Sequence, residues 1–153
     1  MNMDSSSITP IELGTVQKRI IIFIIILAFI GFVDSLYLSA NSILGITPPC
    51  FITEGCDVVT TSKYSTILGI PMALVGAVYY LFLFLASLFI LEKRHMAVKQ
   101  AIAAISGFGF VFSLWLVYAQ IFLIEAICTY CMISAITTTL IFISSVFLLK
   151  QRP

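Results

Sequence analysis

Four cysteines, arranged as two pairs, are the residues best suited to chemistry. Cys50 and Cys56 have five residues between them, whereas Cys128 and Cys131 form a Cys-Thr-Tyr-Cys motif that opens an apolar stretch. A cysteine pair at the N-terminus of a helix faces the positive end of the helix dipole, which stabilises a thiolate and raises its reactivity near neutral pH. These residue types and spacings favour thiol–disulfide chemistry.

Other uses of the cysteines fit the sequence less well. A c-type haem site requires His directly after Cys131, where Met132 stands. A zinc site normally uses two short cysteine pairs, and one pair here is widely spaced, with His95 as the only histidine. A thioredoxin fold would need a βαβ context around the Cys-x-x-Cys motif. We therefore predict no metal site.

Two inert structural disulfides remain the main alternative, and the protein would then be a non-enzymatic membrane scaffold. A bond between Cys128 and Cys131 would close a very small ring, so it would remove little chain entropy from the unfolded state and stabilise poorly. Redox chemistry is a better use of this pair. At the edge of a membrane, a suitable partner is a quinone, which takes up the two electrons and two protons that a dithiol releases.

The elements that position these cysteines are membrane spans. Of the 153 residues, 61% are hydrophobic and 10% are charged, whereas a soluble domain has about 45–50% apolar and about 25% charged residues. A charge at the bilayer centre is costly and a helical span needs roughly 20 apolar residues, so uncharged runs mark the spans. The sequence predicts an all-α integral membrane protein with a four-helix bundle, with spans at Ile20–Ala40, Ile67–Leu91, Ala101–Leu123 and Cys128–Leu149.

The orientation of the bundle follows from its basic residues. All of them except Lys63 fall on one side of the predicted spans, which is the positive-inside pattern of cytoplasmic segments. We therefore predict cytoplasmic termini, an outer loop at Asn41–Thr66 and an outer turn at Glu125. All four cysteines then face outward. The basic residues on the inner side are Lys18, Arg19, Lys93, Arg94, Lys99, Lys150 and Arg152.

The remaining segments allow simple predictions. Residues 1–17 are polar and are expected to form a tail, and residues 18–150 form the membrane domain. A cleaved signal peptide at Lys18–Ala40 is disfavoured, because the apolar run exceeds the usual 7 to 15 residues. Asp34 in the first span is a candidate proton relay, although contact with interfacial water is the favoured interpretation. The net charge of +1 gives no basic field for nucleic acid.

An ordered set of motifs resembles the vitamin K epoxide reductase family, and specifically its prokaryotic members, over Ile20–Leu149. DsbB-like quinone reductases share the chemistry but carry their Cys-x-x-Cys motif in the first outer loop. The matching motifs are Cys50-x5-Cys56, the run from Cys56 to Tyr64, Gly69-Ile-Pro71, the run from Gly76 to Tyr80, and Cys128-Thr-Tyr-Cys131.

The resemblance implies a relay of electrons through the two cysteine pairs. It makes Cys131 the thiol that reacts with a quinone of the ubiquinone or menaquinone type, and Cys128 its disulfide partner. Cys56 would exchange with Cys128, and Cys50 with a thioredoxin-fold (DsbA-like) protein outside the plasma (inner) membrane. Since this chain carries no fused thioredoxin-like domain, the partner is expected to be a separate protein.

The resemblance also suggests residues around the quinone. Ser62 matches a loop serine that helps to hold the loop over the pocket. Vertebrate members have a tyrosine where this chain has Ala135, and an asparagine where it has Met72. Reduction of vitamin K epoxide is therefore doubtful, whereas reduction of a plain quinone is expected. Met72 and Ala135 are candidate pocket residues, with packing against lipid or protein as the alternative.

Overall fold

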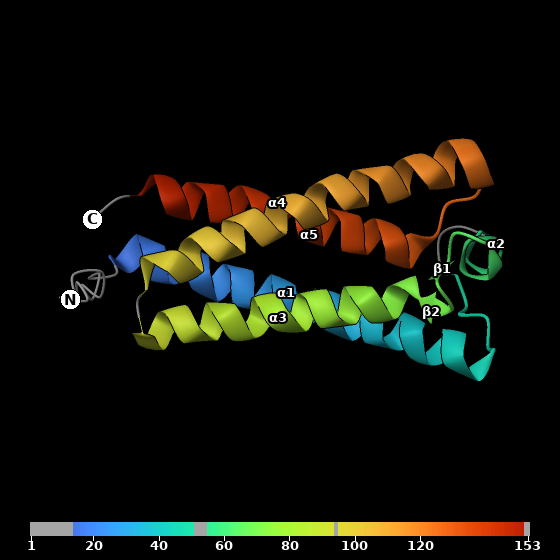
Figure 1. Cartoon of the computed structure of the whole chain (residues 1–153), viewed down its shortest axis with the longest axis horizontal. Coiled ribbons are helices and arrows are strands. Elements are labelled where there is room, and N and C mark those ends of the chain that lie inside the picture. The colour runs from blue at the N-terminus through green and yellow to red at the C-terminus, as the bar shows by residue number, and fades with distance from the viewer. Residues whose placement is uncertain (1–13, 51–54, 94, 152–153) are drawn as a thin grey trace, which may run out of the picture.

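The protein is a bundle of long helices in the computed structural model (Figure 1), which describes residues 14–50, 55–93 and 95–151. Within these residues, four helical segments are long and apolar enough to cross a membrane, which confirms the predicted fold class. They are α1 (Thr15–Leu44), α3 (Met72–Lys93), α4 (Met96–Tyr118) continued by the π-helical turn η1 (Ala119–Ile124), and α5 (Thr129–Lys150).

Short elements connect α1 to α3. The helix α2 (Cys56–Thr61) is followed by the strands β1 (Thr66–Ile67) and β2 (Ile70–Pro71), which pair in an antiparallel hairpin. The turn residues Leu68 and Gly69 both have positive φ, of 52° and 82°, as a tight two-residue hairpin requires. The predicted start of the second span at Ile67 is therefore wrong, because the chain first turns back on itself.

The other predicted boundaries differ by a few residues. The helix α1 begins at Thr15, so the end of the predicted tail is helical, while residues 1–13 lie outside the described part of the chain. Its last turn closes at Gly45, whose left-handed φ of 68° ends the helix. The helix α4 begins at Met96, ahead of the predicted Ala101, because the connection from α3 is very short.

A buried tyrosine joins three helices in the middle of the bundle. The Tyr80 hydroxyl on α3 forms hydrogen bonds of 2.8 Å with the Ser134 hydroxyl and 2.7 Å with the Thr138 hydroxyl, both on α5. Its ring packs directly on Gly31 of α1, where a Cβ would lie 2.5 Å from a ring carbon. Glycine at this position therefore allows α1, α3 and α5 to pack together.

Polar side chains form hydrogen bonds between the helices at the end of the bundle where α1 begins. The Lys99 ammonium on α4 donates a 3.3 Å hydrogen bond to Gln17 Oε1, and Gln17 Nε2 donates a 2.7 Å bond to the carbonyl of Gln151. Further along, the hydroxyls of Ser106 on α4 and Ser145 on α5 lie 2.8 Å apart. These contacts fix the end at which α1 begins and α5 ends.

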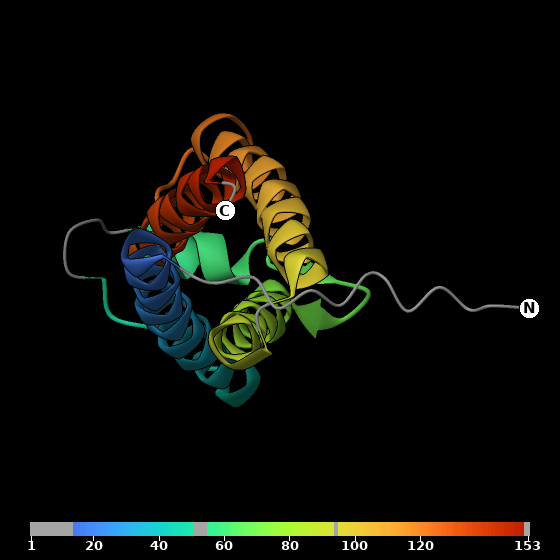
Figure 2. The ribbon, with the colours of Figure 1, turned by 90° about the vertical axis from the view of Figure 1, so that its left-hand side faces the viewer.

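The cysteines lie at the other end of the bundle. Figure 2 shows the four long helices from the end at which α1 begins, with α2 lying across the far end. Cys56 is the first residue of α2 and Cys128 is the N-cap of α5, so the fold brings both cysteine pairs to one end of the bundle.

Candidate functional site

The first cysteine pair is a disulfide between Cys50 and Cys56, with Cα atoms 5.8 Å apart. Cys50 lies half-buried in the connection after α1, whereas Cys56 is only 1% exposed. The Cys56 carbonyl accepts a 2.7 Å hydrogen bond from the Thr60 hydroxyl, which stabilises this short helix. Of the two sulfurs, Cys50 is the one accessible to a molecule outside the bundle.

The second pair is a dithiol at the head of α5. Cys128, the N-cap residue, is completely buried, and Cys131 lies half-buried in the first turn. A hydrogen bond from the Cys131 thiol lowers the pKa of Cys128 from its ordinary value of 9.0 to about 7, and backbone N–H groups of Cys131 and Tyr130 act in the same direction. Burial opposes this shift but is the weaker effect. A large fraction of the Cys128 thiol is therefore ionised near neutral pH.

The two pairs share one apolar cluster. Cys56, Val59 and Cys128 are its buried members, and Cys50 and Cys131 pack against it. Cys56 and Cys128 are thus the two fully buried sulfurs of this cluster, while Cys50 and Cys131 are its half-buried sulfurs. Because the pairs share one cluster, thiol–disulfide exchange between them is chemically feasible.

Gln120 in η1 positions the head of α5. This residue is 3% exposed, and its Oε1 accepts a 3.0 Å hydrogen bond from the backbone N–H of Cys128. Its own carbonyl accepts a 3.1 Å bond from the N–H of Ala126. The turn reverses at Glu125, which has a left-handed φ of 55°. A π-helical turn at this position is typical of a functional site, because it re-aims side chains.

The loop that carries the first pair contacts the head of α5 at two points. The Tyr130 hydroxyl, within the Cys-Thr-Tyr-Cys motif, donates a 3.1 Å hydrogen bond to the carbonyl of Pro49, the neighbour of Cys50. Gly55, the neighbour of Cys56, packs against the backbone of Ile127. Each loop cysteine therefore has a docking contact directly beside it.

A cavity of about 510 Å³ lies beside the dithiol. Its volume is within the range of pockets for cofactors and other small ligands, and its wall is mainly apolar. Cys131 lines it, and so do Ser62, Met72 and Ala135, the three other residues that the sequence singled out. The Ser62 hydroxyl donates a 2.8 Å hydrogen bond to the Val59 carbonyl, which closes the end of α2 over this cavity. The cavity is therefore large enough for a small ligand beside Cys131.

Polar groups also reach the cavity wall. Asp34, Tyr79 and Gln120 line it, and neither the Asp34 Oδ2 atom nor the Tyr79 hydroxyl, both buried, has a hydrogen-bond partner among the described residues. The structure places the Asp34 side chain at the cavity, which the sequence did not predict, while its contact with interfacial water stays a prediction. Sequence position alone did not reveal this, because the rotation of α1 is set by its packing.

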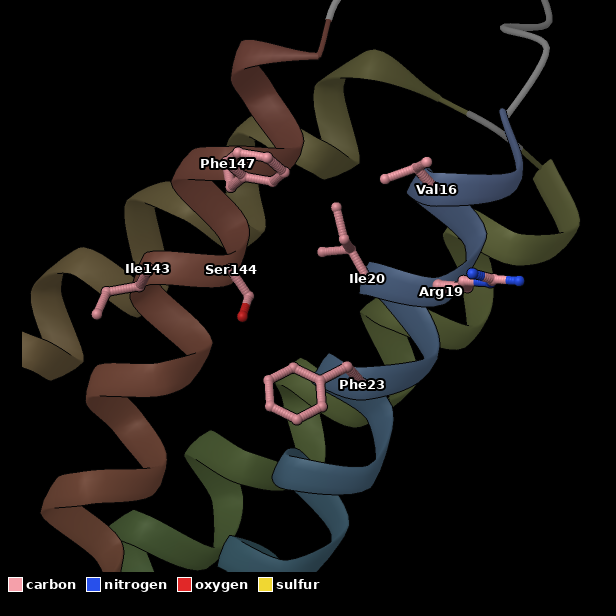
Figure 3. Close-up of a pocket in the computed structure, with 7 residues that line it drawn as sticks. All are labelled: Val16, Arg19, Ile20, Phe23, Ile143, Ser144 and Phe147. Atoms are coloured by element: carbon pink, nitrogen blue, oxygen red, sulfur yellow. The ribbon is translucent and has the colours of Figure 1, made fainter.

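Another groove, of about 350 Å³, lies at the opposite end of the bundle between α1 and α5 (Figure 3). It contains no cysteine, and the Arg19 side chain points away from the apolar residues (Figure 3). We therefore assign the chemistry to the cavity at Cys131. The groove is lined by Val16, Arg19, Ile20, Phe23, Ile143, Ser144 and Phe147.

Sequence reasoning missed three residues that shape the site. Gln120 was the most detectable, as an amide side chain within an apolar run. Tyr130 stood inside the motif itself, but nothing in the sequence indicated its contact with Pro49. Gly55 gave no signal beyond its position next to Cys56.

Comparison with protein-family models identifies a family that matches most of the chain. The family model described as "Vitamin K epoxide reductase family" matches residues 22–146, which include both cysteine pairs and the cavity. A search of curated proteins found no match.

Proposed function

Because the chain belongs to the vitamin K epoxide reductase family, we propose that it oxidises a thioredoxin-like partner and passes the electrons through its two cysteine pairs to a quinone. Membership of this family makes it a membrane thiol–disulfide oxidoreductase. The direction of transfer, the quinone and the partner are the proposal. This activity would support disulfide-bond formation outside the cytoplasm.

The order in which the four sulfurs become accessible is the observation that carries the proposal. Cys50 is half-buried in the loop, Cys56 and Cys128 are enclosed in one cluster, and Cys131 lines the cavity. A partner protein is too large to enter the bundle, so it exchanges with Cys50. A quinone dissolved in the bilayer meets Cys131.

Electrons enter through the loop pair. A thiolate of the partner attacks Cys50, and Cys56 leaves as a thiolate. The second thiol of the partner then attacks the mixed disulfide, so the partner leaves oxidised and the loop pair is reduced. This first stage transfers two electrons to Cys50 and Cys56.

The second stage joins the two pairs. The Cys56 thiolate attacks Cys128 of a Cys128–Cys131 disulfide, and Cys131 leaves as a thiolate. Cys50 then attacks Cys56 and releases Cys128. The products are a Cys50–Cys56 disulfide and a dithiol at the head of α5, which is the state in the structure.

The dithiol then gives up its electrons and protons at the cavity. When bound there, a quinone accepts two electrons and two protons and becomes a quinol. Cys131 faces the cavity, and the Cys128 thiolate, stabilised by its hydrogen bond with Cys131, closes the disulfide on Cys131. Met72 and Ala135 would contribute apolar contacts with the quinone ring.

We place the bundle in the plasma (inner) membrane with the cysteines outside. The support is the distribution of the basic residues in the sequence. Only Lys63 falls on the side of the predicted spans that holds the cysteines. A separate thioredoxin-fold protein would then meet Cys50 in a compartment that permits disulfides.

The direct test is quinone reduction by the purified protein. With dithiothreitol as the electron donor, the native chain should reduce a soluble ubiquinone or menaquinone analogue. The Cys131→Ser variant should lose this activity, because no other thiol lines the cavity among the described residues. A native chain that reduces neither quinone would contradict the proposal.

A further inference from the structure

We propose that Gly55 is a positioning residue that keeps Cys56 within exchange distance of Cys128. The inference rests on the proposed relay, because a spacing between the two pairs matters only if electrons cross it. It assigns a role to a residue with no reactive group. The role depends on the absence of a side chain.

The space beside Gly55 is filled by backbone. A Cβ at this position would lie 2.8 Å from the carbonyl oxygen of Ile127, 2.9 Å from its nitrogen and 3.1 Å from the Cβ of Ala126. Real Cβ atoms essentially never approach other atoms within 3.0 Å, so something would have to move. Gly55 directly precedes Cys56, and Ile127 directly precedes Cys128. The contact therefore lies directly beside both buried cysteines in the chain.

The Ile127 side of this contact is held firmly. Gln120 binds the segment on both sides of Ile127, through its carbonyl to the N–H of Ala126 and through Oε1 to the N–H of Cys128. Because Gln120 is itself buried, a shift of this segment would leave buried polar groups without partners, at a cost of about 1–3 kcal/mol each.

On the other side of the contact, Gly55 and Cys56 are joined to α2 by hydrogen bonds. The N–H of Val59 donates a 3.0 Å hydrogen bond to the Gly55 carbonyl, and the Thr60 hydroxyl bonds to the Cys56 carbonyl. A displaced residue 55 therefore moves α2 and Cys56 with it. The added side chain would increase the separation between Cys56 and Cys128. It would move only the part of the cavity wall that belongs to α2, while Cys131 and the wall residues on α3 and α5 would stay in place.

The experiment compares two electron donors in a Gly55→Ala variant. The reduced thioredoxin-fold partner must use the step from Cys56 to Cys128, whereas dithiothreitol can reduce the Cys128–Cys131 disulfide directly. We expect quinone reduction with the partner to fall on the order of 10- to 100-fold, since a misplacement of about 1 Å can cost that much. Quinone reduction with dithiothreitol should stay within about twofold of the native rate.

A second readout needs no quinone. In a chain with Cys50→Ser and Cys131→Ser, diamide should oxidise Cys56 and Cys128 to one disulfide. Adding Gly55→Ala should slow the formation of this bond by a similar factor. The matched control is Gly14→Ala, where a Cβ would meet nothing within 4 Å. In each assay it should match the same chain without this change.

The outcomes separate this inference from the proposed function. A native chain that fails with dithiothreitol contradicts the proposed function. A native chain that works, with Gly55→Ala equal to it in both assays, overturns the role of Gly55. An equal loss with both donors also overturns it, because simple misfolding predicts that result. If Gly55→Ala does not accumulate, Ala126→Val crowds the same contact from the other side and should give the same donor-dependent loss.

Discussion

Cys56 at the start of α2 and Cys128 at the head of α5 are both almost fully buried and belong to one apolar cluster. Neither sulfur is placed to meet a partner protein, and Cys128 does not line the cavity among the described residues. Their shared enclosure is explained if they exchange with each other. Two independent structural disulfides would not require it.

Removing the two outer thiols should trap this exchange. In the Cys50→Ser, Cys131→Ser variant, Cys56 and Cys128 should form one stable disulfide, because no thiol remains to resolve it. Mass spectrometry should detect a peptide crosslink between α2 and the head of α5. Two free thiols under oxidising conditions would favour the scaffold alternative, and the Cys56→Ser, Cys131→Ser variant serves as a control for random pairing.

Replacing Cys50 with Ser should separate the two electron donors. Quinone reduction with the partner protein should be lost, because Cys50 is the accessible sulfur of the loop pair. Activity with dithiothreitol should persist, since that donor reaches Cys131 of the Cys128–Cys131 disulfide through the cavity. Steady-state rates with both donors measure this, and an equal loss with both would disprove the relay order.

Labelling in intact cells should report the topology. After mild reduction, a membrane-impermeant maleimide should modify Cys50, which is half-buried in the outer loop. Cys56 should react far more slowly, because it is 1% exposed. If Cys50 is modified only after lysis, then the proposed orientation is wrong.

The ionisation of Cys128 should follow pH with a midpoint near 7. The hydrogen bond from Cys131 stabilises the thiolate, so the thiolate fraction grows as the pH rises through about 7, below the ordinary 9.0. In a Cys50→Ser, Cys56→Ser chain, the ultraviolet absorbance of the thiolate should rise over that interval, and this measurement needs no reagent to reach the buried sulfur. Cys131→Ala should move the midpoint upward, whereas Cys131→Ser, which keeps a donor, should move it less. An unchanged midpoint in Cys131→Ala would contradict this assignment.

Tyr130→Phe should weaken loop docking without changing the cysteines. It removes the hydrogen bond to the Pro49 carbonyl but keeps the ring that packs on Tyr37. A hydrogen bond of this kind contributes about 0.5–1.5 kcal/mol, so partner-driven quinone reduction should fall roughly 2- to 10-fold. The rate with dithiothreitol should hold. Tyr118→Phe, on an exposed ring, is the matched control, and an equal effect of both changes would exclude a docking role.

Hydropathy and motif spacing were enough to predict the spans and to bring the four cysteines to one end. Both depend on local composition: a span needs a long uncharged run, and the cysteines border such runs. The start of α3 at Met72 was missed because the preceding hairpin is also apolar, so hydropathy does not distinguish it from the helix.

Hydropathy and motif spacing could not predict the finer geometry of the site. The roles of Gln120 and Gly55 depend on which backbone atoms lie opposite them, and that arrangement exists only after α2 docks on the head of α5. The position of Asp34 at the cavity likewise depends on the rotation of α1 within the bundle. These contacts form only when the helices pack together, and the sequence carries no periodic pattern that predicts them.

The contact between Tyr80 and Gly31 bears on how the molecule moves. The ring interlocks α1 with α3, and the hydroxyl anchors both to α5, so sliding one helix along another would break buried hydrogen bonds and create a steric clash. The long helices therefore keep their relative positions during thiol–disulfide exchange, and we expect any displacement that the exchange needs to be confined to the short helix α2.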